Sequence, residues 1–238
     1  RRRRRDHNQS LMDAPRPTGN RLAIVHGHSL PPGMTIETEG VVALPRHGLD
    51  HGVPAHLLDH HANIRAVCEL GCDRVIALAS VGGLRADLPA GTLVCPGDFF
   101  APGVAPSFYE DSRGHSVPGF DQSWRRRLLD AWGASAQMPL RDGGVYAQVP
   151  GPRFETPAEV RMLARHADVV GMTIAAESIL AKEAGIAYAA ICTVDNLANG
   201  LEAGPLSVDG YRAFRAGFAP RLLEDLGRVL PGLAAGVR

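Results

Sequence analysis

The chain has 238 residues, which is long enough for one large domain or two small ones. Hydrophobic residues make up 45% and charged residues 21%, as in ordinary globular proteins. The 25 basic and 25 acidic side chains cancel, and no apolar run reaches membrane-spanning length, so composition indicates neither nucleic-acid binding nor a membrane span.

The N-terminal segment begins with five consecutive arginines and lacks the apolar stretch of a signal peptide. Such a run could bind phosphates or lipid headgroups, but a disordered or expression-derived tail is the commoner explanation. The stretch up to Asn20 is turn-forming and poor in apolar residues. We therefore interpret residues 1–20 as a tail and residues 21–238 as one domain.

Apolar, β-branched runs alternate with segments of helical period through the rest of the chain. Strands are predicted at residues 21–27, 41–45, 73–84, 91–100, 143–151, 168–172 and 188–196, and helices at residues 55–71, 123–134, 156–167, 175–185 and 207–230. Because strands and helices alternate without a repeat or a linker, we predict an α/β fold with functional residues at the strand ends.

The four cysteines are Cys68, Cys72, Cys95 and Cys192. Their spacing fits no metal framework, and they lie in apolar runs or on a predicted helix. We interpret them as reduced core thiols, which predicts a cytoplasmic protein.

The segment 145–163 begins as a strand, breaks at Pro-Gly-Pro and restarts as a helix. The break carries Arg153, Phe154 and Glu155. Thr156 is expected to cap the helix, with Glu159 completing a capping box. A cation, an aromatic ring and a carboxylate on one turn suggest ligand contacts, although Arg153 is expected to form a structural ion pair.

Polar groups at other strand ends suit an anion. A phosphate needs a planar cationic fork, further donors and exposed backbone N–H groups. Arg46 would supply the fork and His47 a donor, while the glycine turn at residues 79–83 would expose N–H groups. Thr173 adds a hydroxyl near a helix start, where the helix dipole favours negative charge. Each group alone is more often structural, and their convergence on one sheet edge favours an anion site.

Asn196 follows the last predicted strand. Its amide carries both a donor and an acceptor, which match O6 and a protonated N7 of a purine. The alternative is a turn-forming or capping asparagine.

Taken together, blocks of the sequence resemble the trimeric nucleoside phosphorylases, which include purine nucleoside phosphorylases and 5′-methylthioadenosine or 5′-methylthioinosine phosphorylases. The blocks include "PRHGLDHGVPAHLLDHHANIRAVCELG", "VIALASVGGLRADLPAGTLVCPGDFF", "GPRFETPAEVRML" and "DVVGMTIAAESILAKEAGIAYAAICTVDN", within residues 41–212. The resemblance implies a single domain with a central mixed β-sheet, partly curled into a barrel and flanked by helices. It also implies a homotrimer with sites near the subunit interfaces.

The resemblance implies that inorganic phosphate attacks C1′ of a purine nucleoside while the base departs. Phosphate is the only co-substrate, with no further cofactor and no metal. The family pattern assigns phosphate to Arg46, His47, Thr173 and the N–H of Ser80. It places Met172 under the ribose, Phe154 and Glu155 against the purine, Asn196 at N7 and O6, Val208 in the 5′ pocket and His115 towards a neighbouring subunit's site.

Relatives carry a Gly-Gly-Ser/Thr-Gly turn after the first strand, and its hydroxyl touches phosphate. This chain has "VHGHSLPPG" there, so Ser29 or His28 is the candidate substitute. No polar partner for a 5′-hydroxyl is evident near Val208, which favours a methylthio group.

The pair of Glu155 and Asn196 favours a 6-oxopurine, since Glu155 can accept from N1–H, which adenine lacks. A one-residue bulge would instead bring Asp195 into the site and favour adenine.

Three rival functions remain open. One is a zinc hydrolase built on the histidines of residues 47–61, of which His56 and His60 share a helix face. Another is a nucleoside hydrolase of the same fold, which uses water in place of phosphate. The third is a non-catalytic nucleoside-binding protein.

Overall fold

The computed structural model describes residues 13–31, 34, 36–202 and 208–235. The strands are β1 (Arg21–His26), β2 (Val41–Pro45), β3 (Cys72–Gly83), β4 (Leu93–Cys95), β5 (Asp98–Phe100), β6 (Leu140–Asp142), β7 (Val145–Gln148), β8 (Val169–Gly171) and β9 (Ala187–Leu197). The helices are α2 (His60–Glu69), α3 (Gln122–Ser135), α4 (Pro157–Leu163), α5 (Ile174–Ala184) and α6 (Val208–Ala234), with short 3-10 turns η1 (Ala55–Leu57) and η2 (Ser112–Gly114).

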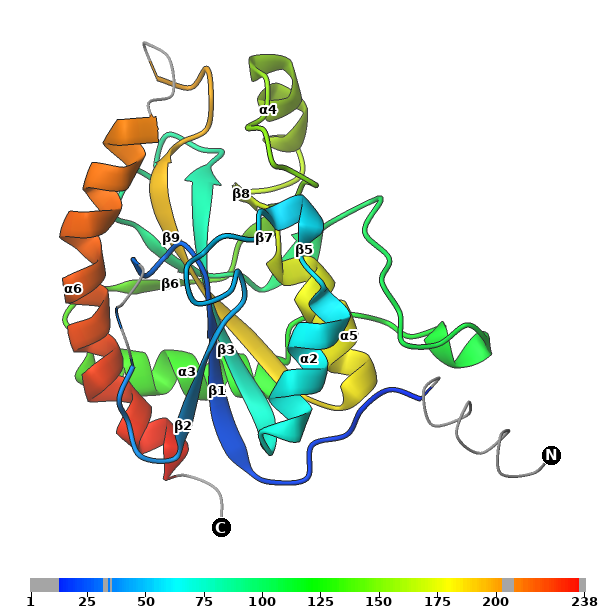
Figure 1. Cartoon of the computed structure of the whole chain (residues 1–238). Coiled ribbons are helices and arrows are strands. Elements are labelled where there is room, and N and C mark those ends of the chain that lie inside the picture. The colour runs from blue at the N-terminus through cyan, green and yellow to red at the C-terminus, as the bar shows by residue number, and fades with distance from the viewer. Residues whose placement is uncertain (1–12, 32–33, 35, 203–207, 236–238) are drawn as a thin grey trace.

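Within these residues the strands form one mixed sheet in the order β5-β7-β8-β3-β9-β4-β6, and β1 joins β2 to β3. The pairs β3–β8 and β4–β9 are antiparallel, and the other pairs are parallel. One edge of the long strand β3 pairs first with β1 and then with β8, while its other edge pairs with β9, and the sheet curls into a half-barrel (Figure 1). The predicted fold class is confirmed.

Helices cover both faces of this sheet, because side chains alternate along each strand. In β1, Leu22 and Ile24 pack with α3 and α6, whereas Ala23 and Val25 pack with α2 and α5. Figure 1 shows α6 and α3 on one side of β1 and β3, and α2 and α5 on the other. Both faces are therefore buried, which accounts for the unbroken apolar runs of the central strands.

Two predicted elements are interrupted in the structure. The strand expected at residues 91–100 is divided into β4 and β5, because Pro96 has no N–H to donate and Gly97 donates instead to Gly144 O. The helix expected at residues 55–71 is interrupted before α2, where the Asp59 side chain accepts a hydrogen bond from Ala62 N at 2.8 Å and caps the helix.

The segment 13–20 lies against the domain. Ala14 is buried in the core, and the Arg113 guanidinium pairs with the Asp13 carboxylate. Residues 1–12, with the arginine run, lie outside the described residues, so the predicted tail and its boundary stay a prediction. No helix in the described ranges is long and apolar enough to cross a membrane.

Candidate functional site

A cavity of about 380 Å³ opens between the ends of β3, β8 and β9 and helix α6. Its volume lies within the range of small-molecule sites. The predicted site residues on its wall are Arg46, His47, Ser80, Phe154, Glu155, Met172, Thr173 and Asn196. Segments up to 150 residues apart in sequence thus contribute to one site, as the strand-end pattern predicted.

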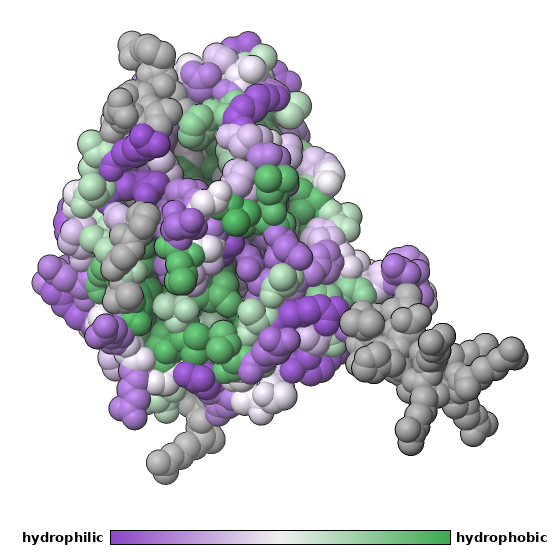
Figure 2. Space-filling model, in the orientation of Figure 1, coloured by the Kyte–Doolittle hydropathy of each residue, from purple (hydrophilic) through white to green (hydrophobic). Residues whose placement is uncertain are grey.

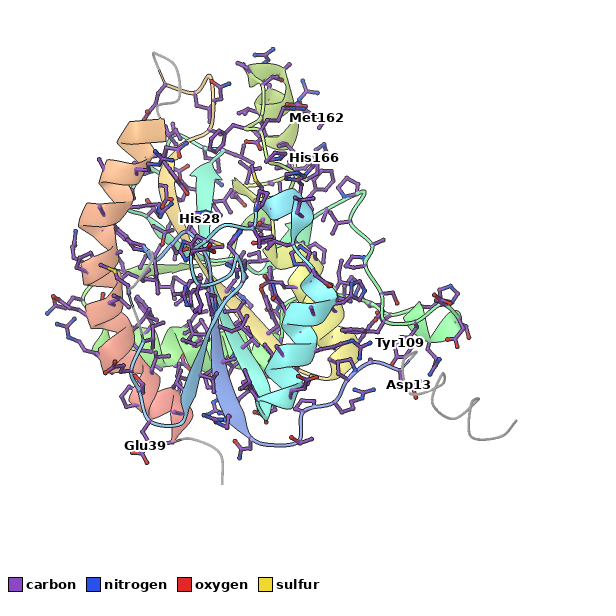
Figure 3. The ribbon with its side chains drawn as sticks, viewed as in Figure 1. Asp13, His28, Glu39, Tyr109, Met162 and His166 are labelled. Carbon is purple, nitrogen blue, oxygen red and sulfur yellow. The ribbon has the colours of Figure 1, made fainter. Side chains whose placement is uncertain are left out.

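The predicted residues that do not line the cavity are Ser29, Asp195 and His115. Ser29 is buried with its hydroxyl unpaired, while its neighbour His28 lines the cavity. His115 is exposed on the long loop after β5 (Figure 1). Figure 3 shows Tyr109 of this loop well apart from His28 at the cavity. Val208 begins α6, but its side chain lies outside the described residues.

A gap in the sheet forms one wall of the cavity. The β1–β3 pairing ends at Ala77, and β8 pairs with β3 only from Gly82 onwards. The Leu78 carbonyl, which faces this gap, accepts from Arg46 Nη1 at 2.7 Å. Residues two apart in a strand point their backbone groups to the same side, so the Ser80 N–H faces the gap as well.

Arg46 does not offer its guanidinium fork to the cavity as predicted, because Glu177 occupies it. Nε donates to Glu177 Oε1 at 2.6 Å and Nη2 to Oε2 at 3.1 Å. With the bonds to Leu78 O and Val25 O, four of the five N–H groups are used, which leaves one on Nη1. Burial alone would raise the pKa of Glu177, but the charge and hydrogen bonds of Arg46 outweigh it and the net pKa is lowered. The pair is therefore ionised and close to neutral overall.

The role of His47 also differs from the expectation of a donor. Its Nδ1 lies 2.7 Å from Val53 O. A carbonyl oxygen only accepts, so the proton is assigned to Nδ1 and Nε2 is left as an acceptor. Burial lowers the pKa of His47 to about 4, which keeps the ring neutral. A neutral His47 can bind a protonated oxygen of phosphate, not a bare one.

His28, His47 and His51 form a cluster of rings at the same side of the cavity. The ring centroid of His28 lies 4.4 Å from that of His47 and 5.3 Å from that of His51. Burial and the neighbouring His47 lower the pKa of His28 to about 3. Among the described residues, no group of three or more His, Cys, Asp or Glu side chains could hold a metal ion. The geometry thus gives the zinc hydrolase no support.

Thr173 stands directly before α5, and its hydroxyl makes no capping hydrogen bond. The protein's own side chains fill part of the helix N-terminus: Tyr146 Oη accepts from Thr173 N and Gln148 Oε1 from Ala176 N, both at 3.0 Å. The N–H groups of Thr173 and Ala176 are therefore already used, and the hydroxyl of Thr173 is a donor left for a ligand.

The turn at residues 150–155 delivers Phe154 and Glu155 to the cavity. A Cβ at Gly151, whose φ is +67°, would lie 2.6 Å from Met172 Sδ, so only glycine fits there. Arg153 forms an ion pair with Glu159, and the capping box is present, both as predicted. Phe154 is 44% exposed, whereas Glu155 is buried, which raises the pKa of its carboxyl.

A β-bulge decides which residue after β9 reaches the cavity. Val81 of β3 pairs with Val194, but Gly82 pairs with Asn196, so Asp195 is the extra residue. Asn196 lines the cavity, and its Nδ2 donates to Leu197 O at 2.7 Å, which leaves Oδ1 available. Asp195 is buried and does not line the cavity. The bulge that was expected to favour Asp195 thus presents Asn196.

The cavity has further walls that the sequence patterns did not single out. They include His51 and Asn199, and Tyr211, Arg212 and Arg215 on α6. The three α6 residues follow Val208 at helical spacing on one face. Extending the Val208 assignment by one and two turns would have identified them.

Comparison with known proteins identifies the fold and its family. The profile of the Phosphorylase superfamily matches residues 19–231. A probable 6-oxopurine nucleoside phosphorylase from Archaeoglobus fulgidus is 41% identical over 164 residues, which cover 68% of this chain and 67% of the relative. A probable S-methyl-5'-thioinosine phosphorylase from Methanothermobacter thermautotrophicus is 38% identical over 172 residues, which cover 71% of this chain and 60% of the relative.

Among solved structures, methylthioadenosine phosphorylase from Schistosoma mansoni in complex with tubercidin superimposes with a TM-score of 0.76. The match covers 92% of this chain and 93% of that structure at 22% identity, so it supports the fold alone.

Replacing Glu177 with Gln should destabilise the fold strongly, because it leaves the charge of buried Arg46 without a counter-charge. We expect a loss of about 3–5 kcal/mol in the free energy of unfolding, measured by urea denaturation. The double variant Glu177→Gln/Arg46→Met should recover most of that loss. Equal instability of the single and double variants would contradict the assignment.

Asp195 predicts a pH dependence of stability. Burial raises the pKa of Asp195 to about 7 from 3.8, although Ser80 and Arg215 lower it in part. Because the pKa of Asp195 is higher in the folded state, its protonated form contributes to the free energy of unfolding. That contribution is fully present below the unfolded pKa and is lost as pH rises through 7. The stability of the wild type relative to Asp195→Asn should therefore fall between pH 4 and 7, by at most about 1.4 kcal/mol per pH unit.

The histidine contributions cancel in this comparison, because both proteins keep the same rings. Asp130→Asn, on the exposed side of α3, controls for the removal of one carboxylate. A difference between the wild type and Asp195→Asn that stays flat from pH 4 to 7 would contradict the prediction.

Proposed function

Because the chain belongs to the Phosphorylase superfamily, we propose that it is a purine nucleoside phosphorylase acting on 6-oxopurine nucleosides. It would cleave the N-glycosidic bond of an inosine, guanosine or 5′-methylthioinosine type of substrate with inorganic phosphate. The products would be the free base and ribose 1-phosphate or its 5-deoxy-5-methylthio analogue. The relatives include proteins named as probable 6-oxopurine and methylthioinosine phosphorylases, which supports this substrate class.

The observation that carries the proposal is the presence of Glu155 and Asn196 in one cavity with Thr173 and the Ser80 N–H. As the glycosidic bond breaks, the sugar becomes cationic and the purine becomes anionic. Oδ1 of Asn196 would accept from the protonated N7, and its second amide N–H would reach O6. These contacts are strongest when the base carries negative charge, so they favour the transition state over the substrate.

The carboxylate of Glu155 would accept from N1–H of a 6-oxopurine. Asn199 Nδ2 donates to the Glu155 carbonyl at 3.0 Å, which helps to hold this turn in place. Phe154 would cover one face of the purine ring. Its side chain is 44% exposed, so it is available to stack on a bound base.

On the phosphate side, Thr173 and Ser80 would donate to the oxyanion while His47 accepts from a protonated oxygen. The single free N–H of Arg46 would add one contact. These groups would hold phosphate beneath C1′, so that attack becomes effectively unimolecular. Met172 would lie under the ribose.

Adenine-type substrates are a second candidate, because the relatives include methylthioadenosine phosphorylases. The S-methyl-5'-thioadenosine phosphorylase of Pyrococcus furiosus, for example, is 37% identical to this chain over 163 residues. Asp195 would be the residue to bind such a base. Its absence from the cavity wall favours the 6-oxopurine.

For the assembly we propose the homotrimer of the family. Leu49, Val53 and Leu57 are exposed in the segment between β2 and α2, beside the cavity residues. Figure 2 shows hydrophobic residues gathered on the face between α6 and α2. A neighbouring subunit would cover such a patch, and the loop of His115 would serve that subunit's site.

A cytoplasmic location is likewise a proposal, supported by four free, buried cysteines. We propose no cofactor beyond phosphate.

The proposed reaction is tested by release of free base from inosine, guanosine, 5′-methylthioinosine, adenosine and 5′-methylthioadenosine, each with and without phosphate. We expect release from the 6-oxopurine nucleosides only when phosphate is present. Equal release without phosphate would establish a hydrolase, and binding without release a non-catalytic protein.

Asn196→Asp should lower kcat/KM for inosine by about 10²-fold, because an amide donor to O6 is replaced by a carboxylate that repels it. Adenosine, whose 6-amino group can donate to that carboxylate, serves as the internal control and should lose less or gain. Unchanged turnover of inosine would remove Asn196 from its proposed role.

A further inference from the structure

Helix α6 brings an arginine into the cavity that no proposed contact has used. Arg215 is 9% exposed and lines the cavity together with Tyr211, one turn earlier on the helix. Its Nη1 donates to Tyr211 Oη at 3.0 Å, and its guanidinium carbon lies 4.9 Å from the Tyr211 ring centroid. Its Nε is buried and has no hydrogen-bond partner.

Arg215 differs from Arg46 in having no carboxylate in direct contact among the described residues. Among the described residues, no carboxylate oxygen lies within 4.0 Å of Arg215, whereas Arg46 is bound by both oxygens of Glu177. Asp195 is close enough to Arg215 to interact electrostatically, but no ion pair within 4.0 Å joins the two side chains. Because burial raises the pKa of Asp195 to about 7, this carboxyl is only partly ionised near neutral pH.

The rings that face Arg215 are neutral as well. Burial is the largest cause that lowers the pKa of His28 and of His51. The nearby charge of Arg215 lowers the pKa of both rings further. Figure 3 shows His28 between α6 and the strand ends. A buried cation among neutral groups is unfavourable unless a ligand supplies the missing negative charge.

The turn after β1 brings no hydroxyl to the cavity wall. Ser29 is buried and does not line the cavity, whereas its neighbour His28 does. With Arg46 neutralised, the donors left near His47 are a hydroxyl, a backbone N–H and one guanidinium N–H. None of these brings an uncompensated charge.

We propose that Arg215, assisted by Tyr211, forms an oxyanion subsite on the α6 wall of the cavity. The subsite rests on the proposed function, since it assumes that the cavity holds a nucleoside and phosphate. Its occupant is an oxyanion with at least two acceptor oxygens, which the planar fork of Arg215 can bind together. That oxyanion is either the phosphate co-substrate or an acidic group attached to C5′ of the nucleoside.

Such a subsite changes the expectation for the 5′ end of the substrate. An apolar methylthio group would leave Arg215 without a partner if the subsite lies at C5′. If the subsite belongs to phosphate, the 5′ group can remain apolar. Separate binding of the two ligands therefore distinguishes the two sources.

The test is calorimetric titration of the full chain with inorganic phosphate and, separately, with inosine and its 5′-carboxylate. The variants are Arg215→Met, Arg215→Lys and Arg221→Met. Arg221 is exposed on the same helix and lies outside the cavity wall, so Arg221→Met makes the same change in net charge away from the site. Thermal unfolding of each variant verifies that it is folded.

We expect Arg215→Met to raise the Kd of one of the two oxyanions by about tenfold or more. Arg215→Lys should have an intermediate effect, and Arg221→Met should bind as the wild type does. Weaker phosphate binding alone assigns the subsite to the co-substrate. Weaker binding of the 5′-carboxylate, with inosine unaffected, assigns it to C5′.

The proposal is overturned if Arg215→Met binds both oxyanions as the wild type does, or if the wild type binds neither. If Arg215→Met does not fold, Arg215→Gln takes its place in the same comparison. Because these are binding measurements, they remain informative when no base is released in the assay, so failure of the proposed function and failure of the subsite are separable.

Discussion

The buried pair of Arg46 and Glu177 is the interaction on which the site depends. It joins the end of β2 to the first turn of α5, and its remaining donors bind the Val25 and Leu78 carbonyls of β1 and β3. Tyr188 of β9 donates to the same carboxylate at 2.6 Å. Because His47 follows Arg46 and α5 follows Thr173, this pair sets the distance between the two groups proposed to hold phosphate.

Using the arginine for structure has a chemical consequence. The ion pair is close to neutral, the three cavity histidines are uncharged, and Asp195 is partly protonated near pH 7. Among the described residues, the cavity wall therefore presents fixed dipoles, and its uncompensated positive charge lies at α6. Fixed groups of this kind need little rearrangement when charge develops on the base and the sugar.

Glu155, Thr173 and Asn196 were predicted from sequence as polar residues that follow strands, and they do line one cavity. The antiparallel pairing of β8 with β3, which brings Thr173 to that cavity, could not be predicted from the same pattern. Nor could the partner of Arg46. Glu177 is 131 positions away on a helix buried on nearly every side, so its sequence shows no polar face to mark it. The bulge at Asp195 depends on cross-strand register with β3, which one strand's sequence does not encode.

The most direct measurement is a crystal structure of the chain with phosphate and a non-hydrolysable inosine analogue. The account predicts the purine between Phe154 and Asn196, with N1 facing Glu155, and phosphate within hydrogen-bond distance of Thr173. A base that contacts neither Glu155 nor Asn196, or phosphate bound outside this cavity, would contradict it.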